Sequence, residues 1–284
     1  MLTASPDDRG VPIRGRRLPL ALWLVCAQLV VAASCTESVP VELPPLSHSS
    51  STASTTEASP DDEHGETTVA FIIERPIFPI QTHDGVLYGT AVPASRRLAA
   101  ELYQRRLGDE IRLYPDTLLK QIKLRQIVLC EDLSFNTTKC FSFTDVEHGS
   151  IYMNVPAGLD DERIRWTIHH EIFHQLDYAG DSRLSPDPAW ESLNPIGFRY
   201  TGDVERLQAD AALARRDAGI KGFVNRYSTT SPPEDKAELY ALMVVDPEEA
   251  HRRLADDDVL HRKATKIREM IDAFGPYSTL LTGR

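Results

Sequence analysis

The spacing of hydrophobic positions changes along the chain and predicts strands early and helices late. Short apolar or alternating runs, rich in β-branched and aromatic residues, occupy 67–80, 125–130 and 149–156. Runs of this kind are typical of strands, and Gly149 and Pro156 bound the last of them. We therefore predict three strands in this part of the chain.

Helical periodicity dominates the remainder. Apolar residues three and four positions apart predict helices over 93–111, 114–122, 160–180, 233–244, 247–258 and 257–274. The helix over 160–180 has acidic residues in its first turn and stops at Gly180, which suits both ends of a helix. Strands followed by helices predict an α+β fold.

The N-terminal region follows a different pattern. A basic stretch is followed by an uncharged apolar stretch over 18–31 and then by small residues, an order typical of an export signal. The apolar stretch is shorter than the roughly 20 residues of a membrane-spanning helix. The ending Ala32-Ala33-Ser34-Cys35 resembles a bacterial lipoprotein signal, in which Cys35 carries the lipid. We expect a signal peptide over 1–34 and a lipid-anchored cell-envelope protein, on the periplasmic or the surface side. An ordinary cleaved signal peptide and an uncleaved anchor are the alternatives.

The segment after the signal lacks the residues of a hydrophobic core. Residues 35–66 are dominated by Ser, Thr, Pro and acidic residues, which bury too little apolar surface to fold. We predict a disordered tether there and one folded domain over 67–284. A tether of this kind would hold a membrane-anchored domain away from the lipid.

Composition and charge narrow the classes of partner. The chain has 42% hydrophobic and 26% charged residues, as ordinary globular proteins do, and its formal net charge is −11. Nucleic-acid binding needs a concentrated basic face, so we expect no nucleic-acid partner. The acidic balance would favour basic peptides as ligands.

Two cysteines lie close together in the predicted domain. Cys130 and Cys140 flank a short segment, and an even pair in an exported chain predicts a disulfide. Two free buried thiols are the alternative.

The helix over 160–180 carries the chemistry. His170 and His174 are four residues apart and therefore project from the same side of a helix, where they can share one metal ion. Glu171 lies between them, as in the H-E-x-x-H arrangement of zinc hydrolases. We predict a Zn²⁺ site, with packed or solvated histidines as the alternative. His169 points about a quarter-turn away, so we expect it to pack or to support a ligand.

A catalytic zinc usually has three protein ligands, so a third must come from elsewhere. The metzincin pattern is excluded, because Asp177 and Gly180 occupy its glycine and third-histidine positions. We therefore expect a downstream carboxylate, and the candidates on these grounds are Glu191, Glu234 and Glu238. The last two are four apart on a predicted helix. Asp235, between them, is expected to be a surface acid.

The segments HEIFHQLDYAG and YSTTSPPEDKAELYALM resemble the catalytic core of the anthrax lethal-factor-like metallopeptidases, a gluzincin group that includes the Pro-Pro endopeptidases. The resemblance implies a zincin-like domain with a small mixed sheet, an active-site helix and a helical C-terminal part. It implies that Glu234 is the third zinc ligand, that Tyr227 stabilises the oxyanion and that Glu238 orients a ligand histidine. It also implies that the strand SIYMNV, at 150–155, is the sheet edge that pairs with an extended substrate.

These motifs together predict an exported zinc endopeptidase that acts on a peptide or protein substrate as a monomer. Zinc would acidify a water, Glu171 would act as the general base and Tyr227 would hydrogen-bond the oxyanion. A zinc-bound envelope protein without catalysis is the main alternative, and the intact Glu171 and Tyr227 argue against it. A metal-sequestering lipoprotein is a third hypothesis, but the chain has no His-rich tract outside this helix.

Overall fold

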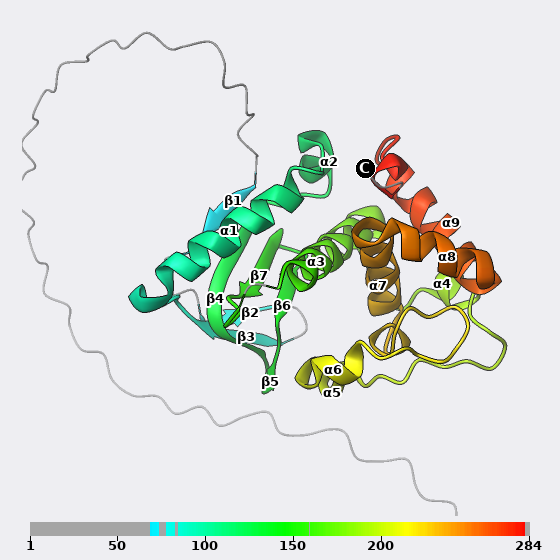
Figure 1. The fold of residues 1–284 in the computed structure, drawn as a ribbon, viewed down its shortest axis with the longest axis horizontal. Coiled ribbons are helices and arrows are strands. Elements are labelled where there is room, and N and C mark those ends of the chain that lie inside the picture. The colour runs from blue at the N-terminus through cyan, green and yellow to red at the C-terminus, as the bar shows by residue number, and fades with distance from the viewer. Residues whose placement is uncertain (1–68, 74–77, 83–84, 159, 282–284) are drawn as a thin grey trace, which may run out of the picture. The chain divides into compact units, whose positions relative to one another are not determined.

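The computed structural model describes residues 69–73, 78–82, 85–158 and 160–281, and within them it confirms an α+β fold (Figure 1). A small mixed sheet comes first along the chain and the helices gather toward the C-terminus. The predicted signal peptide, Cys35 and the tether lie outside the described residues. No helix within the described ranges is long and apolar enough to cross a membrane.

The sheet is built around one long strand, β4 (Gln126–Phe135). Its first half pairs in parallel with β1 on one side and β7 on the other, and its second half pairs antiparallel with β3 and β5. The order of the main path is β2-β3-β4-β7-β6. The other strands are β1 (Ala70–Ile72), β2 (Ile80–Gln81), β3 (Val86–Thr90), β5 (Thr138–Lys139), β6 (Ser142–Asp145) and β7 (Ser150–Asn154).

The edge strand differs from the prediction. β7, which contains most of SIYMNV, lies between β4 and β6 and is buried along most of its length. The edge beside the helices is β6, which runs antiparallel to β7 with Thr144 opposite Ile151. The sequence Ser-Phe-Thr-Asp of β6 is short and has only one apolar residue, so it gives little strand signal.

The predicted long helices are confirmed within a few residues of their expected ends. The α-helices are α1 (Arg97–Ile111), α2 (Asp116–Gln121), α3 (Asp161–Asp181), α4 (Pro188–Glu191), α5 (Val204–Ala209), α6 (Ala211–Ala214), α7 (Pro232–Val245), α8 (Pro247–Asp256) and α9 (Asp258–Asp272). Short 3-10 helices are η1 (Ala94–Arg96), η2 (Tyr227–Thr229) and η3 (Ser278–Leu281). The short segments α4, α5 and α6 lie between two predicted helices, in a region where no helix was predicted, because helices of one or two turns have no readable periodicity.

The helix α3 lies at the centre of the molecule, between the sheet and the C-terminal helices (Figure 1). Its first turn is stabilised by Asp160, whose side chain accepts a hydrogen bond from the Arg163 backbone N–H at 3.2 Å, and by the acidic Asp161 and Glu162. It packs against α1, β6 and α7. This central position buries almost every residue from Ile168 to Asp177.

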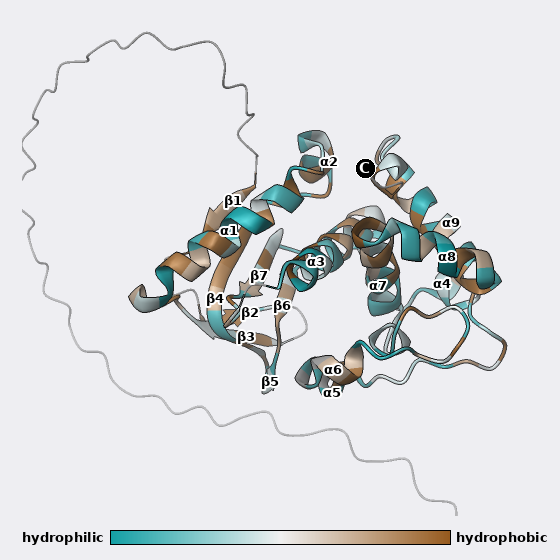
Figure 2. Cartoon of the chain, viewed as in Figure 1, coloured by the Kyte–Doolittle hydropathy of each residue, from teal (hydrophilic) through white to brown (hydrophobic). Residues whose placement is uncertain are grey.

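Alternate residues of β4 and β7 face two different cores. Ile127 and Leu129 face the large core beneath α1 and α3, whereas Val128 and Cys130 face a smaller cluster with Leu87. Figure 2 shows hydrophobic colour gathered on these strands and polar colour on much of α1 and α8. The large core also takes residues from α7 and α9, so α3 is fixed from both sides.

A buried ion pair joins α3 to α7. Lys236 is 1% exposed and its Nζ lies 2.5 Å from a carboxylate oxygen of Asp177 and 3.1 Å from one of Asp187. Breaking such a pair on one side leaves an uncompensated buried charge. The pair therefore constrains how the two helices align, and these are the helices that carry the predicted metal ligands.

The predicted disulfide is not formed. Cys130 and Cys140 are both free and buried in the smaller core. The Cys140 backbone N–H donates to the carbonyl oxygen of Leu133, so Cys140 lies opposite a residue three positions from Cys130 on β4. Three strand residues span up to about 10 Å, beyond the Cα separation of a disulfide. Closeness along the sequence was therefore misleading, because the hairpin of β4 and β5 between the two thiols places Cys140 opposite Leu133 and not opposite Cys130.

Candidate metal centre and reaction site

Three side chains from two helices converge at the middle of α3. His170 and His174 project from α3 one turn apart, and Glu234 projects from the first turn of α7. Oε2 of Glu234 lies 3.0 Å from Nε2 of His170 and 3.6 Å from Nε2 of His174, and the two Nε2 atoms are 3.0 Å apart. The three are the only group of this kind among the described residues, so the structure brings together the predicted ligand set.

The spacing of these atoms suits one zinc ion. Ligands at about 2.1 Å from a tetrahedral zinc lie about 3.4 Å from one another, close to the three separations above. Oε2 of Glu234 is buried and has no partner among the described residues besides the two histidines, so it is available to a cation bound between them. Although burial opposes it, pairing with His174 and His170 lowers the pKa of Glu234, which keeps the carboxylate ionised as a ligand must be. The residues therefore fit Zn²⁺.

Glu238 contacts the ring nitrogen of His170 that faces away from the other two potential ligands. Its Oε1 lies 2.9 Å from Nδ1 of His170, and its Oε2 accepts hydrogen bonds from Trp166 at 3.0 Å and Asn225 at 2.5 Å. Burial lowers the pKa of His170, but Glu234 and Glu238 outweigh it and raise that pKa well above its usual value. Surroundings that favour an imidazolium also favour a dication. No sequence pattern had indicated a role for Trp166 or Asn225.

The carboxylate of Glu171 is held by the edge strand. Ser142 Oγ donates to its Oε1 at 2.6 Å, and Thr144 Oγ1 donates to its Oε2 at 2.5 Å. The two hydroxyl residues are two apart on β6 and so face the same side of the sheet. Glu171 is 5% exposed. Two residues that were not predicted from the sequence therefore position Glu171, and the only sequence signal for them is their alternation in a short polar segment.

Tyr227 packs against His170. It belongs to η2, and its ring centroid is 5.9 Å from that of His170. Gln208, from α5, donates a hydrogen bond to its hydroxyl at 3.1 Å. Burial, and then the charge of Glu234, raises the pKa of Tyr227 well above its usual value, so the phenol stays protonated and can donate.

Other residues considered as candidates lie apart from the three converging ligands. His169 is fully buried between Tyr114 and Glu110, at 2.5 Å and 3.0 Å from its two ring nitrogens, so it packs as expected. Glu191 is exposed on α4 and does not belong to the cluster.

Asp235 is not a surface acid, which corrects the expectation from sequence. It is fully buried, and its Oδ2 accepts hydrogen bonds from Trp190 at 2.8 Å, Tyr200 at 2.7 Å and Lys263 at 2.7 Å. A charged residue between two candidate ligands suggested exposure, but the partner lysine lies 28 positions away and was not visible in the local pattern. The carboxylate fixes the start of α7, where Glu234 lies.

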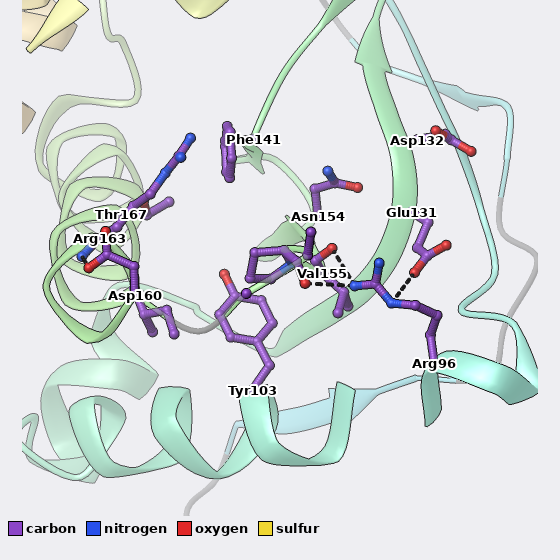
Figure 3. Close-up of a pocket in the computed structure, with 14 residues that line it drawn as sticks. Arg96, Tyr103, Glu131, Asp132, Phe141, Asn154, Val155, Asp160, Arg163 and Thr167 are labelled. Carbon is purple, nitrogen blue, oxygen red and sulfur yellow. Dashed lines mark hydrogen bonds and ion pairs between the residues drawn. The ribbon is translucent and has the colours of Figure 1, made fainter. Parts of the chain in front are cut away.

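The converging residues open onto two cavities that share Ser142, His170, Glu171, Gln208 and Tyr227. The cavity of about 640 Å³ also includes His174 and Glu234, and that of about 120 Å³ includes Glu238. A third cavity of about 450 Å³ adjoins the smaller one, with which it shares Phe141, Arg163 and Thr167 (Figure 3). The cavities that share these lining residues form a cleft next to the three potential ligands, and such a cleft can accept an extended molecule.

Comparisons with known proteins add one distant similarity. No family model matches the sequence, and no curated protein matches it significantly. The crystal structure of a putative zinc-binding metallo-peptidase from Bacteroides caccae matches with a TM-score of 0.45 and 14% sequence identity, over 76% of this chain and 85% of that one. The candidate site is therefore defined by its own geometry.

Proposed function

We propose that this protein is a zinc-dependent peptidase that hydrolyses peptide bonds with Glu171 as general base. One observation carries the proposal: the three potential zinc ligands, the Glu171 carboxylate and the Tyr227 hydroxyl all line the same cavity of about 640 Å³. A metal-binding scaffold would need the three ligands but neither of the other two groups. A chain that acts on peptides needs all five, together with a cleft.

Bound zinc would supply Lewis acidity, which polarises a carbonyl and lowers the pKa of water to about 7. His170, His174 and Glu234 would hold it. Glu171 then accepts a proton from the attacking water and passes it to the leaving amine. Ser142 and Thr144 keep the Glu171 carboxylate in place for both transfers, since each of its oxygens receives a hydroxyl hydrogen bond.

Tyr227 supports the developing negative charge on the substrate. Its ring lies beside that of His170, and its protonated hydroxyl accepts a hydrogen bond from Gln208 that orients it. Donation to the oxyanion would lower the barrier by about 3 kcal/mol. The strand β6 completes the arrangement, because its outer edge has no further strand among the described residues and can pair with an extended peptide.

The resemblance to the lethal-factor-like metallopeptidases supports the same assignment. It rests on Tyr227, Glu234 and Glu238, whose spacing follows that family's second motif. These are the residues that lie around His170, as the distances above describe. We therefore assign the third ligand to Glu234 and the supporting carboxylate to Glu238.

Metal analysis and a peptide-library cleavage assay together test the proposal. We expect about one zinc per chain and cleavage that is lost in Glu171→Gln, while that variant keeps its zinc. Glu234→Ala should lose zinc and activity together. A protein without affinity for zinc would contradict the proposal, and a zinc-loaded protein that cleaves no peptide would favour the scaffold alternative.

Export and lipid anchoring are part of the proposal and rest on the sequence of residues 1–66 alone. We propose that Cys35 is lipidated in a bacterial envelope, with residues 35–66 as the tether. Labelling of cells with a fatty-acid analogue should tag the wild-type protein but not Cys35→Ala. Equal labelling of both proteins would exclude Cys35 as the lipid site.

A further inference from the structure

The cavity of about 120 Å³ beside Glu171 differs in charge from the rest of the cleft. Arg163, from the start of α3, and Arg215, just after α6, both line it, together with Phe141 and Thr167. Figure 3 shows Arg163 and Phe141 side by side where this cavity meets the neighbouring one. Two guanidinium groups therefore lie in the same cavity as the proposed base.

Neither guanidinium has an anionic partner. Arg163 lies over the Phe141 ring, with its central carbon 3.3 Å from the ring centroid, a contact that leaves the N–H groups in the guanidinium plane free. Among the described residues, no ion pair or side-chain hydrogen bond involves the guanidinium of Arg163 or Arg215. The nearby Asp160 carboxylate instead caps α3 by accepting the Arg163 backbone N–H.

The two positive charges also act on each other. Burial, and then the charge of Arg215, lowers the pKa of Arg163 below its usual value. Like charges in one cavity are unfavourable unless an anion lies between them. The charge of Asp160, which lines the neighbouring cavity, partly offsets this effect on Arg163. The two carboxylates among the described residues that line this cavity already have partners. Glu171 is held by Ser142 and Thr144, and Glu238 is held by His170, Trp166 and Asn225.

The larger cavity contains a group of apolar side chains. In the cavity of about 640 Å³, Phe135 and Phe143 are stacked with their ring centroids 4.9 Å apart, and Leu184, Val204 and Pro233 contribute further apolar surface. The arginine there, Arg206, has a partner, since its Nη1 lies 3.6 Å from Asp203. The apolar side chains thus line the cavity of about 640 Å³, whereas the two arginines without an ion pair line the cavity of about 120 Å³.

We propose that Arg163 and Arg215 bind a carboxylate of the substrate, and that the favoured peptides carry it on one side of the scissile bond and a large apolar side chain on the other. The carboxylate belongs either to an internal Asp or Glu or to the C-terminus of the substrate. Guanidinium groups bind carboxylates through paired N–H donors, which gives orientation as well as affinity. This inference rests on the proposed function. It reverses the expectation, drawn from the negative net charge, that basic peptides are preferred. The charge next to the scissile bond determines the preference more than the net charge of the chain does.

Binding to an inactive protein tests the inference without requiring turnover. The zinc-loaded Glu171→Gln protein is titrated with fluorescent peptides that differ by Glu or Gln at one position, each with a free or an amidated C-terminus. We expect the Glu peptide, or the free-acid peptide, to bind about tenfold more tightly than its neutral counterpart. The first result identifies an internal acidic residue and the second identifies a C-terminal carboxylate.

Variants at the two arginines supply the second arm. Arg215→Glu changes an exposed residue and should abolish the preference, and Arg163→Glu combined with Arg215→Glu should shift it toward Lys peptides. Arg105→Glu, an exposed arginine of α1 that lines none of the three cavities, is the matched control and should keep the preference. Equal binding of charged and neutral peptides, or the absence of peptide binding, would overturn the inference.

The outcome also separates this inference from the proposed function. A wild-type protein that cleaves peptides with no preference for a carboxylate would keep the peptidase and remove the subsite. A protein that binds carboxylate peptides through the two arginines but cleaves none would keep the subsite and remove the peptidase.

Discussion

The Glu238 carboxylate lies 2.9 Å from Nδ1 of His170, while Nε2 of the same ring faces Glu234 at 3.0 Å. One imidazole is thus held between two carboxylates with different tasks. A carboxylate behind a ligand histidine fixes the ring and its tautomer and makes the other nitrogen more basic. Because Trp166 and Asn225 also fix Glu238, the orientation of His170 is set before any metal binds.

The first prediction concerns this supporting carboxylate. Glu238→Gln should weaken zinc affinity by about 10- to 100-fold without abolishing it, because the ring loses its charged partner but keeps its position. Competition with a chelator measures the affinity. Glu234→Gln should weaken it far more, since a ligand oxygen is replaced. The reverse order would exchange the roles of the two residues.

The second prediction concerns the contact of the edge strand with the base. Replacing Ser142 by Ala and Thr144 by Val together should lower kcat by about 10- to 100-fold, because an unrestrained carboxylate is less often aligned with the water. KM and zinc content should change little. Thr265→Val, which alters a hydroxyl on the exposed side of α9, is the control. A change confined to KM would show that the two hydroxyls contact substrate instead.

The third prediction concerns Tyr227. Tyr227→Phe removes only the hydroxyl and should lower kcat by about 100- to 1000-fold, as expected for the loss of one oxyanion donor. Zinc affinity should stay the same. Tyr88→Phe, at an exposed tyrosine of β3, should be neutral. Unchanged kcat in Tyr227→Phe would remove this residue from the proposed chemistry.

The fourth prediction concerns the two cysteines of the smaller core. Alkylation of the unfolded protein without a reducing agent should modify both Cys130 and Cys140, since they are free thiols. In the folded protein both should resist alkylation, because each is buried. Mass spectrometry counts the modified thiols. A protein that gains no label when unfolded would contain the disulfide after all.

The fifth prediction concerns stability at high pH. Burial raises the pKa of the Cys130 and Cys140 thiols from 9.0 to about 12. The folded protein therefore keeps protons that the unfolded chain releases, so this contribution is present below pH 9 and is lost as the pH rises from 9 toward 12. Denaturant unfolding at about pH 8 and about pH 11 measures the loss. The double variant Cys130→Ala, Cys140→Ala should show a smaller decrease.

The site could be predicted from the sequence where metal-binding residues lie on a segment with clear helical periodicity. His170, Glu171 and His174 lie on one predicted helix, and the same local pattern gave α7 and its two glutamates. Contacts between residues far apart in the sequence could not be predicted from local patterns. The strand β6 is too short and too polar to be read from its sequence, and so the hydroxyls that hold Glu171 were missed. Asp235 was misjudged for a related reason, because its burial depends on Lys263 in another helix.

The hydrogen bonds of Asp235 limit how far the domain can be truncated from its C-terminal end. Asp235 directly follows Glu234 in the sequence. Its carboxylate accepts hydrogen bonds from Trp190, Tyr200 and Lys263, which lie in three other parts of the chain. The last of these parts is α9, which supplies none of the three potential ligands. A shortened protein that ends before α9 would keep the whole H-E-x-x-H helix and yet lose the anchor beside its third ligand. The smallest fragment that can bind the metal ion therefore has to include α9, which lies well beyond both helices that carry the potential ligands.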